Sequence, residues 1–153
     1  MTRLSIKLVA GLVLAASMVL AGPTDVAAQD EAPIVTYRKG LMQAIRYNNG
    51  QIRAVGDAGQ PTHAVHYARA LYGLGEMLPD VWPQGSTGEG SRAAAAIWSN
   101  QRQFNQAVEA FQSATAQLLE AAEGRDQAAF GRAMQALGPT CGGCHQTFRG
   151  PAN

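Results

Sequence analysis

Apolar residues recur along most of this chain at alternating spacings of three and four, the repeat of a helix with one buried face. The repeat predicts four helical segments, at residues 34–55, 62–78, 91–124 and 130–148. Their apolar positions are, in chain order, Ile34, Leu41, Ile45, Ile52 and Val55; Ala64, Tyr67, Leu71, Leu74 and Leu78; Ile97, Phe104, Val108, Phe111, Thr115, Leu118 and Ala122; and Phe130, Met134, Leu137, Cys141, Cys144 and Phe148. Four amphipathic helices predict an all-α bundle.

Proline and glycine mark the ends of these segments. Pro79 ends the second helix and opens a long connection, rich in glycine, that extends to Gly90. Gly124 follows the third helix at the usual position of a helix stop. Gly138 and Pro139 interrupt the fourth segment, and they predict either a bend or a restart of that helix.

Residues 1–28 have the pattern of a secretory signal peptide. Arg3 and Lys7 supply a positive charge ahead of an apolar stretch of 14 residues that ends at Ala21. We expect cleavage after Ala21 or after Ala28. The apolar stretch is short for a spanning helix, so we expect no stable membrane anchor; an uncleaved anchor is the alternative.

The segment that remains after cleavage, residues 29–153, has the length of one domain. Removal of Arg3, Lys7 and Asp25 leaves ten basic and ten acidic side chains, so the charges nearly cancel. No polybasic run or basic face is recognisable, and we therefore expect no binding to nucleic acid or to anionic lipid. Alanine is abundant and β-branched residues are sparse, which favours helix.

Cys141 and Cys144 are the only cysteines, and His145 follows the second one directly. This C-x-x-C-H pattern is typical of c-type haem attachment, in which two thioethers hold the porphyrin and the imidazole is an axial ligand of the iron. Both cysteines fall on the apolar stripe of the last predicted helix, with His145 one turn beyond Cys141. A thioredoxin-like redox pair, a structural disulfide and half of a zinc site are the alternatives. Export favours haem, because c-type haem is attached outside the bacterial cytoplasm.

Taken together, these residues resemble the class II cytochromes c, meaning cytochrome c′ and its low-spin relatives. The residues that carry the resemblance are Tyr37, Arg38 and Met42; Trp82 to Ser86; Ile97, Trp98 and Phe104; and Cys141 to Arg149, which read C-x-x-C-H-x-x-F-R. The resemblance covers nearly all of the chain after the signal peptide. It implies an antiparallel four-helix bundle with one covalently attached haem c near the C-terminus, and a homodimer through the first two helices.

The resemblance also implies roles for residues on the other side of the iron. Met42 is expected on the distal side, either as a sixth ligand of a low-spin iron or packed over a five-coordinate iron that is open to NO or CO. Arg38 is expected near the haem propionates. Thr87 and Glu89, in the long connection, are expected near the same haem edge.

No catalytic triad, pair of interior carboxylates or phosphate-binding loop is recognisable, so we do not expect an enzyme. The predicted function is the transfer of single electrons between periplasmic redox partner proteins, with NO or CO binding possible at an open iron. Two alternatives stay open. One is a gas-binding haem protein with little electron-transfer role, and the other is a non-haem helical interaction module that is closed by a disulfide.

Overall fold

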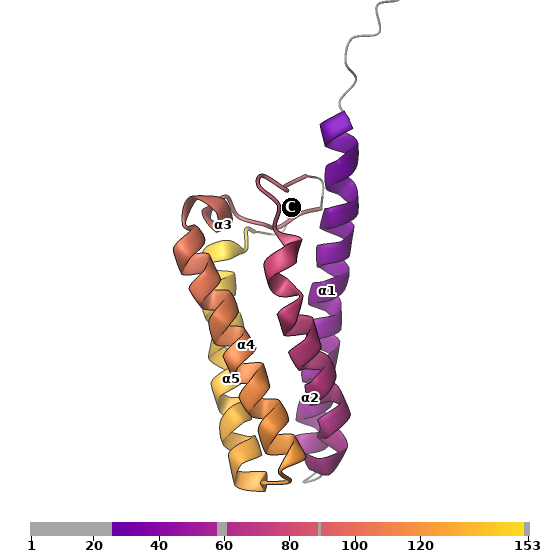
Figure 1. The fold of residues 1–153 in the computed structure, drawn as a ribbon, viewed down its shortest axis with the longest axis vertical. Coiled ribbons are helices and arrows are strands. Elements are labelled where there is room, and N and C mark those ends of the chain that lie inside the picture. Colours follow the sequence, from indigo (N-terminus) through magenta and orange to yellow (C-terminus); the bar gives the residue numbers. More distant parts are fainter. Residues whose placement is uncertain (1–25, 58–60, 89, 152–153) are drawn as a thin grey trace, which may run out of the picture.

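In the computed structural model, which describes residues 26–57, 61–88 and 90–151, four long helices lie side by side (Figure 1). They are α1 (Val26–Asp57), α2 (Pro61–Glu76), α4 (Gln101–Glu123) and α5 (Gln127–Phe148). A 3-10 turn, η1 (Leu78–Val81), and the short α3 (Ala96–Ser99) lie between α2 and α4. Consecutive long helices run in opposite directions, which confirms the predicted all-α, antiparallel four-helix bundle (Figure 1). The predicted signal peptide lies almost entirely outside the described residues and stays a prediction.

The predicted apolar stripes meet in one core between the helices. Leu71, Leu118 and Leu137, from three different helices, are completely inaccessible to solvent. Other stripe residues in this core are Leu41, Ile52, Ala64, Leu78, Ile97, Phe104, Val108, Phe111, Phe130 and Phe148. Ile45 and Cys144 are only partly buried, because they border a cavity. The three-four repeat therefore predicted which face of each helix packs inward.

The first and the fourth helix differ in extent from the prediction. The first helix begins at Val26 rather than at Ile34, and it continues through Pro33. A repeat of apolar residues reports only the packed part of a helix, so it could not reveal this extension. The fourth helix runs without a restart from Gln127 to Phe148, although Pro139 lies inside it.

The predicted third helix is wrong in its first part. Asn100, with φ −122° and ψ 47°, separates α3 from α4. Before α3, the backbone pairs with the end of α5 instead of forming a helix: the Ala94 N–H donates to the Phe148 carbonyl at 3.0 Å, and the Gly150 N–H donates to the Arg92 carbonyl at 2.7 Å. These contacts between distant segments override the helix propensity of the local alanines.

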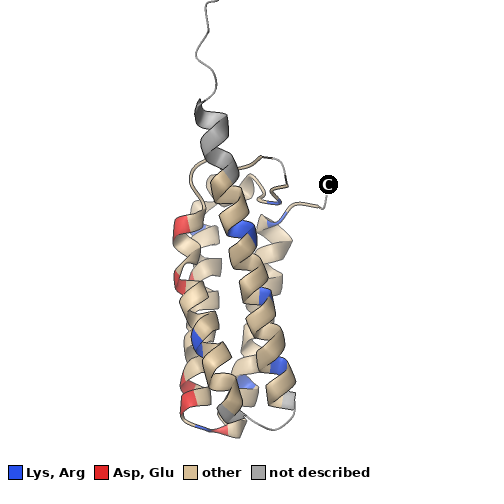
Figure 2. Ribbon diagram, turned by 90° about the vertical axis from the view of Figure 1, so that its right-hand side faces the viewer, with Lys and Arg blue, Asp and Glu red and all other residues tan. Residues whose placement is uncertain are grey.

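Charged side chains are unevenly distributed over the bundle (Figure 2). Lys and Arg follow α1 down its length, on the side that faces the viewer, and Asp and Glu gather along the left-hand edge. The expectation that the nearly neutral chain has no basic face is therefore wrong. The segregation arises because the fold places the acid-free parts of α1 and α5 on one side, whereas α2, η1 and α4 carry five acidic residues.

Candidate cofactor site

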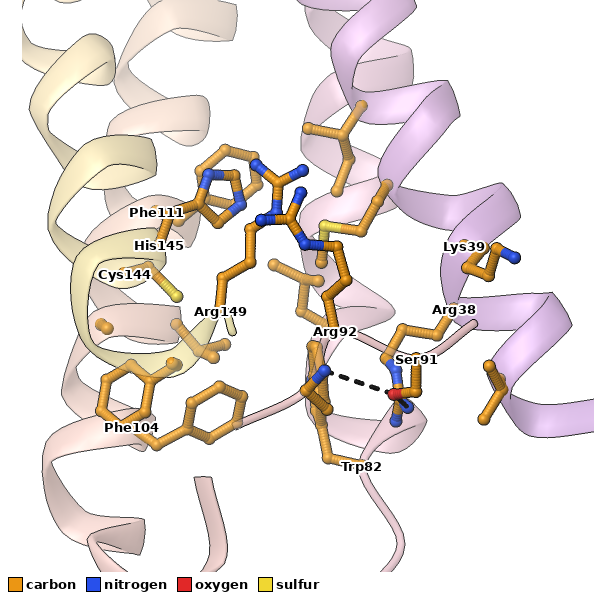
Figure 3. Close-up of a pocket in the computed structure, with 18 of the residues that line it drawn as sticks. Arg38, Lys39, Trp82, Ser91, Arg92, Phe104, Phe111, Cys144, His145 and Arg149 are labelled. Atoms are coloured by element: carbon orange, nitrogen blue, oxygen red, sulfur yellow. Dashed lines mark hydrogen bonds between the residues drawn. The ribbon is translucent and has the colours of Figure 1, made fainter. Parts of the chain in front are cut away.

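A cavity of about 530 Å³ opens between α1, α4, α5 and the connection that follows α2 (Figure 3). Its volume falls within the range of small-molecule and cofactor sites, about 300–1,000 Å³. The lining is mainly apolar and comes from Val35, Met42, Ile45, Leu78, Trp82, Phe104, Ala107, Val108, Phe111 and Phe148. A large, apolar and partly open cavity suits a flat hydrophobic ligand that carries a polar edge.

Cys144 and His145 project from α5 toward this cavity (Figure 3). Met42, on α1, is also among the residues that line it. Cys141 lies one helical turn earlier, where its thiol is 3.8 Å from the Leu137 carbonyl and packs against the core. The two thiols are not bonded to each other. In the part of the chain that the structure describes, no three His, Cys, Asp or Glu side chains gather into a closed metal site.

The surroundings set the protonation of these groups. Burial raises the pKa of both the Cys141 and the Cys144 thiol. Burial, together with the nearby charges of Arg149 and Arg92, lowers the pKa of His145. Figure 3 shows both guanidinium groups beside the imidazole. The lowered pKa favours the neutral imidazole, which is the form that can coordinate a metal.

Arg38 also lines the cavity, but its side chain is committed to the connection. It is only 4% exposed, and its two terminal nitrogens donate to the Val81 carbonyl at 3.1 Å, to the Ser86 hydroxyl at 2.9 Å, to the Ser86 carbonyl at 2.6 Å and to the Ser91 hydroxyl at 3.0 Å. Its guanidinium carbon lies 4.6 Å from the centre of the Trp82 ring. Arg38 therefore fixes the loop that forms one wall of the cavity.

Comparison with known proteins agrees with this geometry. The sequence profile described as cytochrome c′ matches residues 33–149. Cytochrome c′ of Rhodospirillum rubrum is 35% identical over 144 residues, which cover 90% of this chain and 96% of that protein. Cytochrome c-556 of Agrobacterium tumefaciens (strain II Chrys) is 36% identical over 118 residues, which cover 75% of this chain and 95% of that protein. The solved structure of cytochrome c prime from Shewanella frigidimarina superposes with a TM-score of 0.73 at 27% identity, covering 79% of this chain and 97% of that one.

The chain belongs to the cytochrome c′ family. Members of this family carry covalently bound haem c, and they act as electron carriers or gas-binding proteins rather than as enzymes of a conventional kind. The predicted family and cofactor are thereby confirmed. The C-x-x-C-H segment of this chain lies inside the matched residues.

The residues around the cavity fit a haem on grounds of their own. Trp82, Phe104 and Phe148 form an aromatic wall, with ring centres 5.2 Å and 5.1 Å apart and near-perpendicular planes. The Trp82 indole N–H is buried and has no hydrogen-bond partner among the described residues. A buried donor of this kind needs an acceptor, and a haem propionate supplies one. Together with His145 and the Cys144 thiol at the same cavity, this wall fits a haem c.

The two predicted haem-edge residues of the connection differ in outcome. Thr87 is exposed, its hydroxyl donates to the Gly85 carbonyl at 3.3 Å, and it is not among the residues that line the cavity. Glu89 lies outside the described residues and stays a prediction. Sequence reasoning missed Trp82 and Arg92 as cavity residues, although Trp82 stands in the connection that carries part of the family resemblance.

We predict that Arg38→Met loosens the connection. The substitution keeps the apolar stem but removes four hydrogen bonds, and it leaves the Val81 and Ser86 carbonyls without this donor. The free energy of unfolding should fall by about 1–3 kcal/mol, and amides between residues 82 and 91 should exchange faster in hydrogen–deuterium exchange. Lys39→Met, at the exposed neighbouring position, is the matched control. Equal protection of these amides in both variants would contradict this role of Arg38.

Proposed function

We propose that this protein is an exported carrier of single electrons, with one haem c attached through Cys141 and Cys144 and with His145 as an axial iron ligand. The haem supplies a one-electron iron couple. The observation that carries the proposal is the meeting of Cys144, His145 and Met42 at one largely apolar cavity. Cys141 belongs to the same helix one turn earlier, at the spacing that the C-x-x-C-H pattern requires.

The protein's own residues perform three tasks in this function. The covalent anchors keep the cofactor from dissociating, and the bundle holds it against a rigid aromatic wall. Buried apolar side chains such as Val108 and Phe111 line the inner part of the site, where they would limit the reorganisation that accompanies a change of charge. No carboxylate is among the described residues that line the cavity.

Gas binding is the second candidate function. The position of Met42 supports it as well as electron transfer. Met42 is half-buried, packs against the core and lines the cavity from α1, the helix across from His145. As a ligand, its thioether would complete the coordination of the iron and suit electron transfer. As a packing residue, it would leave an apolar surface beside the iron that could admit NO or CO.

Export and assembly belong to the same proposal. The charged and apolar pattern of residues 1–28 supports delivery to the periplasm, where c-type haem is attached. Of the helices that the structure describes, none is long and apolar enough to cross a membrane. Periplasmic redox proteins are the proposed partners, and a homodimer through α1 and α2 is proposed from the family resemblance alone.

Spectroelectrochemical titration of the purified holoprotein tests the electron-carrier function. We expect a single reversible wave that corresponds to one electron per chain, because one C-x-x-C-H segment anchors one haem. The reduced and oxidised spectra should interconvert repeatedly without loss. An iron that cannot be cycled reversibly, in a protein that still takes up NO or CO, would contradict the carrier role and favour the gas-binding one.

Met42→Ala decides how the distal face is used. Loss of a ligating thioether should convert a low-spin ferric spectrum to a high-spin one and lower the reduction potential. Met134→Ala, which removes a partly buried methionine outside this cavity, is the matched control and should leave the spin state unchanged. A spectrum that Met42→Ala does not alter would show that Met42 only packs beside the iron.

A further inference from the structure

Three cations recur at intervals of seven along α1, at Lys39, Arg46 and Arg53. This interval places them on one side of the helix, and all three side chains are exposed. Lys39 and Arg46 line the cofactor cavity. Arg53 lines a second cavity of about 420 Å³, farther along α1, whose other residues come from α1 and α5. The stripe therefore borders the side of the bundle on which α1 and α5 face each other.

Arg92 and Arg149 add two more cations at the cofactor cavity. Arg92 is held in place, because its Nε and one terminal nitrogen donate to the Gly150 carbonyl at 2.9 Å and 2.7 Å. We call Lys39, Arg46, Arg53, Arg92 and Arg149 the basic face. Among the described residues that line either cavity, none is Asp or Glu.

Among the acidic side chains that the structure describes, five lie on α2, η1 and α4. They are Glu76, Asp80, Glu109, Glu120 and Glu123, and these elements carry only Arg69 and Arg102 as lysine or arginine cations. Arg69 forms an ion pair with Glu123, which links α2 to α4 away from the cofactor cavity. The described charges are thus segregated, although the net charge of the chain is close to zero (Figure 2).

Haem would not neutralise the basic face. Its two propionates cancel two positive charges at most, and four members of the face line the cofactor cavity. A surplus of positive charge would remain around the cofactor, and Arg53 extends it along α1. Charges that surround a site in this way steer a partner of opposite sign toward it, by factors of about 10–1,000 in association rate, and salt weakens the effect.

We propose that the basic face is the docking surface for an acidic redox partner protein, which it orients over the cofactor cavity. This inference rests on the proposed electron-carrier function. The side of the bundle formed by α2 and α4 has a surplus of carboxylates and repels the same partner. The uneven charge distribution therefore favours partners that are negatively charged, and it favours their approach to the basic face.

The test is stopped-flow oxidation of the ferrous holoprotein by two small reagents of opposite charge, hexacyanoferrate(III) and tris(phenanthroline)cobalt(III). Salt is raised from about 0.01 M to about 0.3 M. We expect the rate with the anionic oxidant to fall as salt rises and the rate with the cationic oxidant to increase. Arg46→Gln combined with Arg53→Gln should slow the anionic reaction about three- to tenfold at low salt and accelerate the cationic one.

Arg69→Gln combined with Arg102→Gln, on the acidic side, is the matched control, because it changes the net charge equally. A change in reduction potential would alter both reactions in the same direction, so opposite changes identify an effect of docking. Equal responses of the two double variants, or rates that do not depend on salt, would overturn the docking proposal and leave electron transfer standing. Failure of the ferrous protein to react with either oxidant would overturn the proposed function, and the docking proposal with it.

Discussion

The buried guanidinium of Arg38 is the contact on which the architecture of the site depends. It reaches from α1 into the connection after α2 and meets one carbonyl and one hydroxyl of Ser86 there, as well as Val81 and Ser91. Burial lowers the pKa of Arg38, but an arginine side chain stays charged in a protein at neutral pH. A buried charge without partners would be costly, and the four hydrogen bonds offset that cost.

The effect of Arg38 extends through Trp82 to the other helices. The guanidinium lies over the Trp82 ring, Trp82 packs edge-on against Phe104 of α4, and Phe104 packs in the same way against Phe148 of α5. A second tryptophan fixes the backbone of the connection, because the Trp98 indole N–H donates to the Pro83 carbonyl at 2.9 Å. One side of the cavity is thus built from contacts that link α1, α4 and α5 through a segment with little regular structure of its own.

Sequence reasoning predicted the parts of this structure that depend on local repeats. The apolar stripes gave the four helices and their buried faces, and the C-x-x-C-H pattern gave the cofactor and the helix that presents it. The non-helical start of the predicted third helix could not be predicted, because it depends on backbone pairing between Ala94 and Phe148, which are far apart in the chain. The interior role of Arg38 and the basic face could not be predicted for the same reason. Both depend on which helices become neighbours, and neither the hydropathy pattern nor the net charge gives that information.

The most direct test of the central claim, a covalently bound haem c at Cys141 and Cys144, is intact mass spectrometry of the exported protein under denaturing conditions. Our account predicts a chain that begins at Gly22 or Gln29 and carries the mass of one haem, with the added mass on the peptide that contains both cysteines. A chain that has the mass of the polypeptide alone, or that releases its haem on denaturation, would contradict it.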